Sequence, residues 1–117
     1  MDKMEYDIRL ATQKDIEKIA EIYVDSWQKT YKGMLSQAYL DSLTVQNIST
    51  RWSEYIEQNH HGIFVAHKDD NILGFGAFKP YHRIEDCIYI ESLHVDEAYH
   101  KKGIGSSIIN TIRTSIN

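Results

Sequence analysis

The sequence predicts a mixed α/β domain of the α+β kind, in which a mostly antiparallel sheet is flanked by helices in the order β-α-α-β-β-β-α. Three observations support this fold class. Helical periodicity dominates the first half, short apolar runs separated by turn residues dominate the second, and a glycine turn joins the last run to a final helix. Such an order of elements is typical of a layered domain with one core.

The first half begins with a short strand and a capped helix. Asp7 to Leu10 alternate between polar and apolar residues, as a half-buried strand does. Thr12 then occupies an N-cap position, with Asp15 three residues later as an acidic form of the capping box. The helix is expected to end by Gly33, and its apolar stripe consists of Ile16, Ile19, Ala20, Tyr23 and Trp27.

Two further helical segments complete the first half. Residues 34–43 are expected to form a short helix or an irregular turn. Thr44 is expected to cap a second long helix, whose apolar stripe consists of Val45, Ile48, Trp52, Tyr55 and Ile56.

The second half opens with a predicted β-hairpin. Residues 63–67 and 72–78 are its strands, and the polar residues 68–71 connect them. Gly74 and Gly76 lie within the second strand. Glycines in a strand interior predict a bulge, or another part of the molecule or a ligand passing close by.

A third strand and a helix follow the hairpin. A polar loop at 81–86 leads to the longest strand, at 87–95, where Cys87 is expected to be a small buried residue. A charged turn at 96–102 then precedes the final helix, at 103–116.

Composition places the chain among soluble globular proteins. Its 117 residues carry 13 Lys and Arg against 17 Asp and Glu, and this acidic balance argues against a nucleic-acid-binding protein. No apolar run is long enough to span a bilayer, and no secretory signal is recognisable. The single cysteine allows neither an intramolecular disulfide nor a zinc-binding pair. We therefore expect one cytoplasmic domain over residues 1–117, with no metal, nucleic-acid or membrane partner.

The turn before the final helix has the chemistry of a polyphosphate site. The first N–H groups of a helix lack intrahelical partners, and the helix dipole favours negative charge there. Gly103 and Gly105 let the backbone approach an anion closely, and Lys101 and Lys102 add positive charge. No Walker A lysine follows, and Ile108 stands at the third position of a dinucleotide fingerprint, so a nucleotide-phosphate binder is disfavoured.

These residues resemble the GNAT superfamily of N-acetyltransferases, whose central motif is a strand, then [Arg/Gln]-x-x-Gly-x-[Gly/Ala], then a helix. The segment His100-Lys101-Lys102-Gly103-Ile104-Gly105 occupies that motif, with His100 where the family usually has Arg or Gln. The approach at 93–99 and the opening at 8–12 are also similar to the family. The resemblance covers nearly the whole chain and implies acetyl-CoA as co-substrate.

The resemblance also implies which residues hold acetyl-CoA. The strand residues Leu93, His94 and Val95 would border the pantetheine, which would pair with main-chain groups of Leu93 and Val95. The pyrophosphate would lie against the turn, whose residues are His100, Lys101, Lys102, Gly103, Ile104, Gly105 and Ser106. Because most of these contacts come from backbone amides, His100 changes only one side-chain contact.

Three more residues are candidates for the chemistry and for the acceptor. A primary amine must lose a proton before it attacks a thioester, and Glu91 is the expected general base. Trp27 and Tyr31 would contact the acceptor, a small-molecule or peptide amine. Each candidate also has a structural interpretation: Glu91 as a polar residue on a half-exposed strand, and Trp27 and Tyr31 as part of the helical core stripe.

The resembled domain normally continues for several dozen residues after the motif helix, so we expect a partial, C-terminally truncated domain. The strand at 87–95 would then expose an apolar edge, which invites pairing. We expect a homodimer through that edge or through the final helix. Two functions follow from these features: an N-acetyltransferase-like enzyme, or a non-catalytic acyl-CoA-binding or interaction module.

Overall fold

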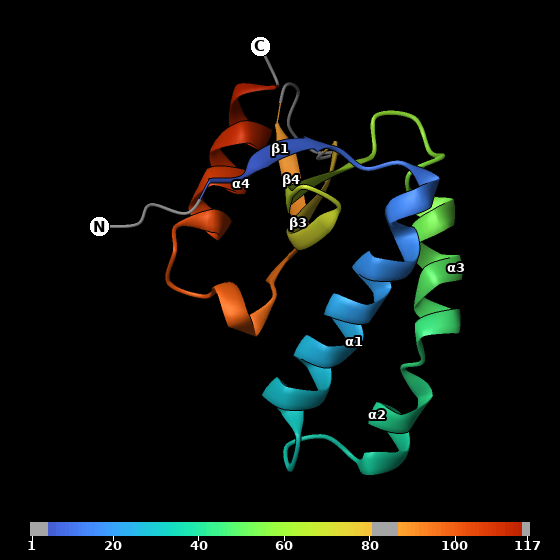
Figure 1. The fold of residues 1–117 in the computed structure, drawn as a ribbon. Coiled ribbons are helices and arrows are strands. Elements are labelled where there is room, and N and C mark those ends of the chain that lie inside the picture. The colour runs from blue at the N-terminus through green and yellow to red at the C-terminus, as the bar shows by residue number, and fades with distance from the viewer. Residues whose placement is uncertain (1–4, 81–86, 116–117) are drawn as a thin grey trace.

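The computed structural model describes residues 5–80 and 87–115 (Figure 1). The strands are β1 (Asp7–Leu10), β2 (Gly62–Lys68), β3 (Asn71–Pro80) and β4 (Ile88–Val95), and the helices are α1 (Ile16–Tyr31), α2 (Gln37–Ser42), α3 (Val45–Tyr55) and α4 (Ile104–Thr114). The short 3-10 turns η1 (Gln13–Asp15) and η2 (Glu97–Tyr99) precede α1 and follow β4. The predicted order of elements is confirmed, with α2 as the helical outcome for residues 34–43.

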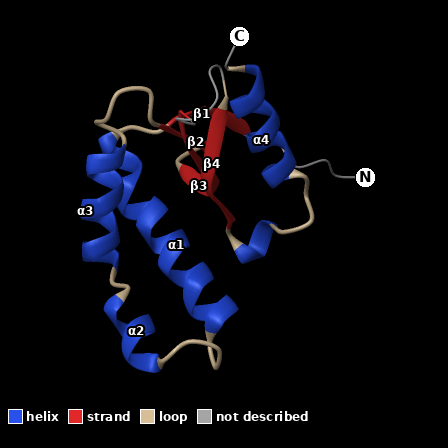
Figure 2. Ribbon diagram, turned by 180° about the vertical axis from the view of Figure 1, so that it is seen from behind, coloured by secondary structure: helices blue, strands red, loops and turns tan. Residues whose placement is uncertain are grey.

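The four strands form one antiparallel sheet in the order β1-β2-β3-β4, so the predicted fold class is confirmed. α1 and α3 cover one face of this sheet and α4 covers the other, as the two opposite views show (Figure 1 and Figure 2). Among the described residues, no helix is both long enough and apolar enough to cross a membrane.

The helices begin where the local sequence signals place them. The N–H of Thr12 donates to Asp15 Oδ2 over 2.8 Å, which forms one half of the predicted capping box. Arg9 holds both oxygens of the same carboxylate, at 2.8 and 2.9 Å, and this bidentate pair ties β1 to the start of α1. Thr44 caps α3 by accepting a hydrogen bond from the N–H of Asn47 at 3.1 Å.

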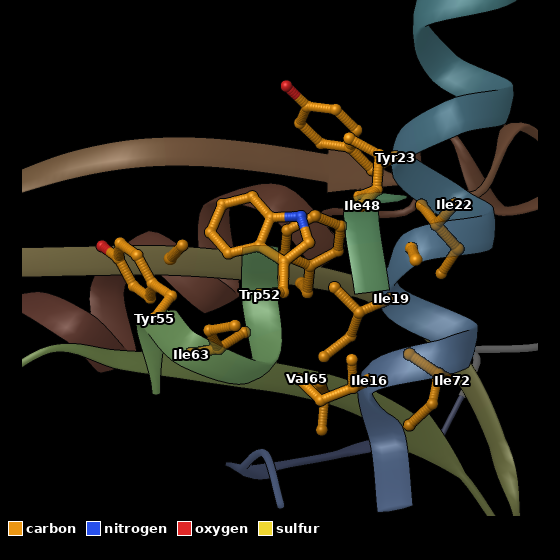
Figure 3. Close-up of a cluster of buried hydrophobic side chains, with 13 residues drawn as sticks. Ile16, Ile19, Ile22, Tyr23, Ile48, Trp52, Tyr55, Ile63, Val65 and Ile72 are labelled. Atoms are coloured by element: carbon orange, nitrogen blue, oxygen red, sulfur yellow. The ribbon is translucent and has the colours of Figure 1, made fainter. Parts of the chain in front are cut away.

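The larger core lies between α1, α3 and the sheet (Figure 3). Trp52 lies at the centre of this core and is only 1% exposed. Its ring meets those of Tyr23, Tyr55 and Phe75 edge-on, with ring centroids 5.0 to 5.8 Å apart. Aromatic pairs in this geometry stabilise a core beyond their burial alone. The residues that the helical stripes predicted supply much of this core: Ile16, Ile19, Ala20, Tyr23, Ile48, Trp52 and Tyr55.

The smaller core lies under α4, which packs tightly on β3 because β3 carries glycine there. A Cβ atom added at Gly76 would lie 2.5 Å from Ile108 Cγ2. The register with β2 shifts beside Gly74, which leaves Leu73 as an extra residue in β3. The glycines of this strand therefore mark both a bulge and a close approach, as predicted.

Several element boundaries and one burial state differ from the sequence-based expectation. β2 extends to Lys68 and β3 begins at Asn71, so the hairpin connection is residues 69–70 and not 68–71, and α4 runs from Ile104 to Thr114. Cys87 is exposed rather than buried and precedes β4, which begins at Ile88. The reason is that β4 is the last strand of the described sheet, so its first residues have a neighbour on one side only. β3 continues to Pro80, whose missing N–H is tolerated at the end of a strand. The predicted loop at 81–86 lies outside the described residues.

Candidate active site

The site is built along the outer edge of β4. Within the described residues β4 pairs only with β3, so its other edge is open. The N–H of Asp96, just after β4, donates to the carbonyl oxygen of Leu73 in β3, at 2.8 Å. Because backbone groups alternate in direction along an antiparallel strand, those of Leu93 and Val95 point to the open edge. These are the two residues whose main-chain groups the sequence analysis assigned to pantetheine.

The turn between β4 and α4 forms a cradle of N–H groups. Lys101 and Gly103 have φ angles of +64° and +79°, and Gly103 is the N-cap of α4. The N–H of Ser107 is the first to bond within the helix, to Gly103 O at 3.0 Å. The preceding amides, those of residues 104–106, are therefore directed out of the helix N-terminus, and left-handed residues beside such amides create an anion-binding concavity.

Gly105 gives an independent indication that this cradle is shaped for a ligand. A Cβ atom there would meet Leu93 Cδ2 at 3.7 Å and Val95 Cγ2 at 3.9 Å, which are ordinary contacts. The packing of the protein therefore does not require a glycine at this position, unlike at Gly76. A missing side chain in the first turn leaves room for a phosphate group to approach the backbone. The residues present thus fit the pyrophosphate of a coenzyme.

The side chains of the turn divide between the core and the surface. Ile104 is buried under α4, so only its N–H can face an anion, whereas Lys101, Lys102 and Ser106 are exposed. His100 is exposed too, but its Nε2 lies 2.7 Å from Val95 O. A carbonyl oxygen only accepts, so Nε2 carries the proton. His100 thereby ties the turn to the open edge of β4.

A cleft of about 640 Å³ lies beside this turn, between the second half of α1 and η2. Ser26, Val95 and His100 contribute to its lining. Lys29 links α1 to η2, because it pairs with Asp25 on its own helix and with Glu97 on η2. A hydrogen bond to Glu97, with a second one to Asp25, raises the pKa of Lys29 above its usual value.

Glu91 is placed by a β-bulge in β4. Ser92 pairs with Ala77 and Ile90 pairs with Phe78, so Glu91 is the extra residue between them. A bulge of this kind re-aims a side chain next to a functional site. Glu91 Oε1 lies 3.7 Å from Lys79 Nζ, beyond hydrogen-bond distance, while Oε2 is buried without a hydrogen-bond partner among the described residues.

Tyr55, at the C-terminal end of α3, reaches the same place from the helical layer. Its hydroxyl is also buried without a partner at standard geometry among the described residues. Burial raises the pKa of Tyr55 strongly, and the negative charge of Glu91 raises it further. The phenol therefore lies within reach of the charge of Glu91.

His94 is oriented differently from its two neighbours. Its ring lies on the α1 side, edge-on to Tyr23 with centroids 5.3 Å apart, and its Nδ1 is 3.0 Å from Ser26 Oγ. Its backbone groups point toward β3 by the same alternation. Burial lowers the pKa of His94 below the usual value, which favours the neutral imidazole. The structure thus brings Leu93 and Val95 to the open edge, and places His94 between the sheet and α1.

Trp27 and Tyr31 continue the aromatic row of α1. Their ring centroids are 4.5 Å apart, and Trp27 is 5.9 Å from Tyr23. Trp27 packs against the larger core, in agreement with its structural interpretation. Contact of either residue with an acceptor stays a prediction.

Two residues of the Glu91 environment were not identified from sequence. Tyr55 belongs to an apolar helical stripe, where a phenol that meets a carboxylate looks the same as one that only fills a core. Lys79 stands at the end of a strand and carries no motif. An antiparallel pairing of β3 with β4 could have brought Lys79 near Glu91, but the bulge that aligns them has no sequence signature of its own.

Among the described residues, the fold is an α/β domain with an unpaired edge on β4, a glycine-containing turn after it and the covering helix α4. The chain belongs to the acetyltransferase (GNAT) family, whose family model matches residues 16–114.

Curated relatives agree with this membership. The chain is 29% identical over 106 residues to the uncharacterized N-acetyltransferase YuaI of Bacillus subtilis, and the match covers 87% of this chain and 59% of that protein. It is 24% identical over 105 residues to a probable N-acetyltransferase of Mycobacterium tuberculosis, covering 88% of this chain and 60% of the relative. The chain therefore spans about three fifths of the length of these relatives.

Solved structures share the fold. The PaiA N-acetyltransferase of Thermoplasma acidophilum, solved in complex with coenzyme A, superposes with a TM-score of 0.82 at 22% identity, covering 97% of this chain and 72% of that one. An N-acetyltransferase of Staphylococcus aureus gives a TM-score of 0.70 at 25% identity, covering 97% of this chain and 67% of that one.

Proposed function

We propose that this protein transfers an acetyl group from acetyl-CoA to a primary amine. The observation that carries the proposal is the combination of an N–H cradle at residues 101–106 with the outward-facing backbone of Leu93 and Val95. The coenzyme A in the structure of the Thermoplasma acidophilum protein supports it, because the two folds superpose closely.

The turn and the strand edge would divide the coenzyme between them. The amides of residues 104–106, with Lys101 and Lys102 nearby, would hold the pyrophosphate. The pantetheine would pair with Leu93 and Val95 as an added strand does. Glu91 lies four residues back from Val95, a distance of about 13 Å at the usual rise of a strand. The carboxylate is therefore suited to act at the far end of this edge.

The proposed chemistry assigns a proton-transfer role to Glu91. An amine acceptor arrives as an ammonium ion and has to lose a proton, which Glu91 takes directly or through one water. The nitrogen lone pair then attacks the thioester carbonyl carbon, a C–N bond forms, and the C–S bond breaks. The nitrogen, which is positively charged after the attack, loses its second proton as the C–S bond breaks. The sulfur leaves with the bonding pair and takes up one proton, so that the products are an amide, the free thiol of CoA and one released proton.

The surroundings of Glu91 suit a base that binds a cation first. Its Oε1 lies 3.7 Å from Lys79 Nζ, and both side chains are only partly exposed. A pair at that distance is held by charge alone and not by a hydrogen bond. An acceptor ammonium can therefore replace Lys79 at this oxygen without breaking a hydrogen bond.

Calorimetry with CoA tests the binding half of the proposal. Gly105→Asp places a carboxylate in the cradle, whereas Asn110→Asp adds the same charge at an exposed position farther along α4. We expect the first variant to bind at least about tenfold more weakly, equivalent to roughly 1.4 kcal/mol, and the second to bind as the wild type does. Aspartate is favourable in the first turn of a helix, so Gly105→Asp should fold. Equal affinities in all three proteins contradict the proposed site.

Release of free CoA thiol with a panel of amines tests the catalytic half. We expect turnover in the wild type and a loss of roughly 100-fold or more in Glu91→Gln, which keeps the shape of the side chain but cannot accept the proton. CoA binding without turnover in the wild type identifies the alternative, a non-catalytic acyl-CoA-binding module.

A further inference from the structure

The bulge at Glu91 gives the two carboxylate oxygens different surroundings. Oε1 faces Lys79 at the partly exposed side, and Oε2 is buried without a partner at standard geometry among the described residues. A carboxylate oxygen that is removed from water normally accepts a hydrogen bond, because an unsatisfied one is costly. We therefore expect Oε2 of Glu91 to accept a hydrogen bond from a donor inside the protein.

Tyr55 is the donor that the fold directs to this place. Its ring is fixed by Trp52 and His61, with centroids 5.0 and 4.8 Å away, and the residue is 9% exposed. Figure 3 shows Tyr55 at one end of the cluster of core side chains, with its hydroxyl directed away from Trp52. The hydroxyl likewise has no partner at standard geometry among the described residues.

We propose that Tyr55 is a positioning residue for Glu91: its O–H donates to the inward oxygen Oε2 and leaves the outward oxygen Oε1 free for the amine. This inference rests on the proposed function of Glu91. Hydrogen bonds of catalytic groups are often long without substrate and shorten in the complex, which fits two neighbouring groups that do not yet meet at standard distance.

The charge state of the phenol suits this role. Burial and the neighbouring carboxylate both raise the pKa of Tyr55, so the hydroxyl keeps its proton and remains a donor throughout the neutral range. A hydrogen bond to one oxygen of a carboxylate also fixes the plane of the group. The second oxygen then points in one direction, and less side-chain freedom is lost when the amine binds.

Kinetics of Tyr55→Phe test the inference, with Tyr23→Phe as the matched control. Both residues are buried in the same core and each variant loses a single hydroxyl. For Tyr55→Phe we expect kcat to fall about tenfold with little change in the KM for acetyl-CoA. A merely structural role would instead change the KM for acetyl-CoA along with kcat. Tyr23→Phe should leave both kcat and KM unchanged.

A spectroscopic comparison that needs no turnover separates this inference from the proposed function. In protein labelled with [ζ-13C]tyrosine, the Tyr55 Cζ signal at neutral pH should differ between the wild type and Glu91→Gln, because the hydroxyl exchanges a charged acceptor for a neutral one. The Tyr23 signal should not move. That difference would stand even if the wild type proved inactive, in which case only the proposed function fails. A Tyr55 signal that Glu91→Gln leaves unmoved overturns the inference, as does an active Tyr55→Phe with wild-type kcat.

Discussion

Gly76→Ala should both destabilise the protein and disturb its coenzyme site. The new Cβ would lie 2.5 Å from Ile108 Cγ2 and 3.2 Å from Ile112 Cδ1, both on buried residues of α4. Neither side chain can swing into solvent, so α4 has to move away from the sheet. Added atoms in a packed core cost about 1–3 kcal/mol, and removing a glycine from a strand returns about 0.5–1 kcal/mol. The expected net loss is about 1–2 kcal/mol.

Thermal unfolding measures this loss. For a domain of this size, about 1–2 kcal/mol corresponds to a fall in Tm of roughly 4–8 °C. Gly105→Ala is the matched control, because its Cβ would meet nothing closer than 3.7 Å. That variant should unfold at the same or a higher temperature, since alanine favours a helix more than glycine does. A second change, Ile108→Leu, removes the obstructing Cγ2 methyl and should recover part of the stability in Gly76→Ala.

The two glycine substitutions are expected to affect stability and CoA affinity in different ways. Gly105→Ala should bind CoA more weakly while it remains stable, because its methyl group occupies the cradle. Gly76→Ala should lose stability first and affinity only as far as α4 shifts. The reasoning is refuted if Gly76→Ala unfolds at the wild-type temperature. It is also refuted if Gly105→Ala loses stability together with affinity, as Gly76→Ala is expected to do.

Two further predictions concern charge and association. A hydrogen bond from Arg9 lowers the pKa of Asp15, so this pair stabilises the fold fully above pH about 4, and its contribution declines as the pH falls further. Asp15→Asn should therefore cost about 1 kcal/mol in urea unfolding at pH 7 and progressively less below pH about 4, and a difference that does not change with pH would contradict the assignment. The open edge of β4 should pair two copies at micromolar concentration, and Ile90→Lys, at a position 37% exposed, should yield a monomer by light scattering, whereas a monomeric wild type would exclude the dimer.

Short-range sequence signals predicted most of the fold. Asp15 accepts from the N–H of Thr12, and Thr44 accepts from the N–H of Asn47, so each capping bond joins residues only three apart in the sequence. The apolar stripes of α1 and α3 predicted their buried faces for the same reason. Cys87 shows the limit: it follows the pattern of a buried strand residue, but its exposure depends on the absence of a neighbouring strand in the described sheet.

The candidate site was only partly predictable for a related reason. The turn at residues 100–105 is a contiguous motif, and its backbone geometry follows from the glycines. The environment of Glu91 depends on a bulge, which breaks the simple alternation of strand residues and turns this side chain toward Tyr55. Periodicity alone cannot show which residue of a strand is the extra one. The position of Glu91 near Tyr55 of α3 therefore follows only from the pairing register of β3 and β4.

The outward-facing groups of Leu93 and Val95 form a single short row of donors and acceptors, and His100 already engages one of its carbonyls. A pantetheine chain and the edge of a second copy would need the same row, so each would have to displace the other. Occupancy of this edge would then be a competition: added coenzyme would separate paired copies, and a higher protein concentration would weaken the apparent affinity for coenzyme. One strand edge would thus couple self-association to cofactor supply.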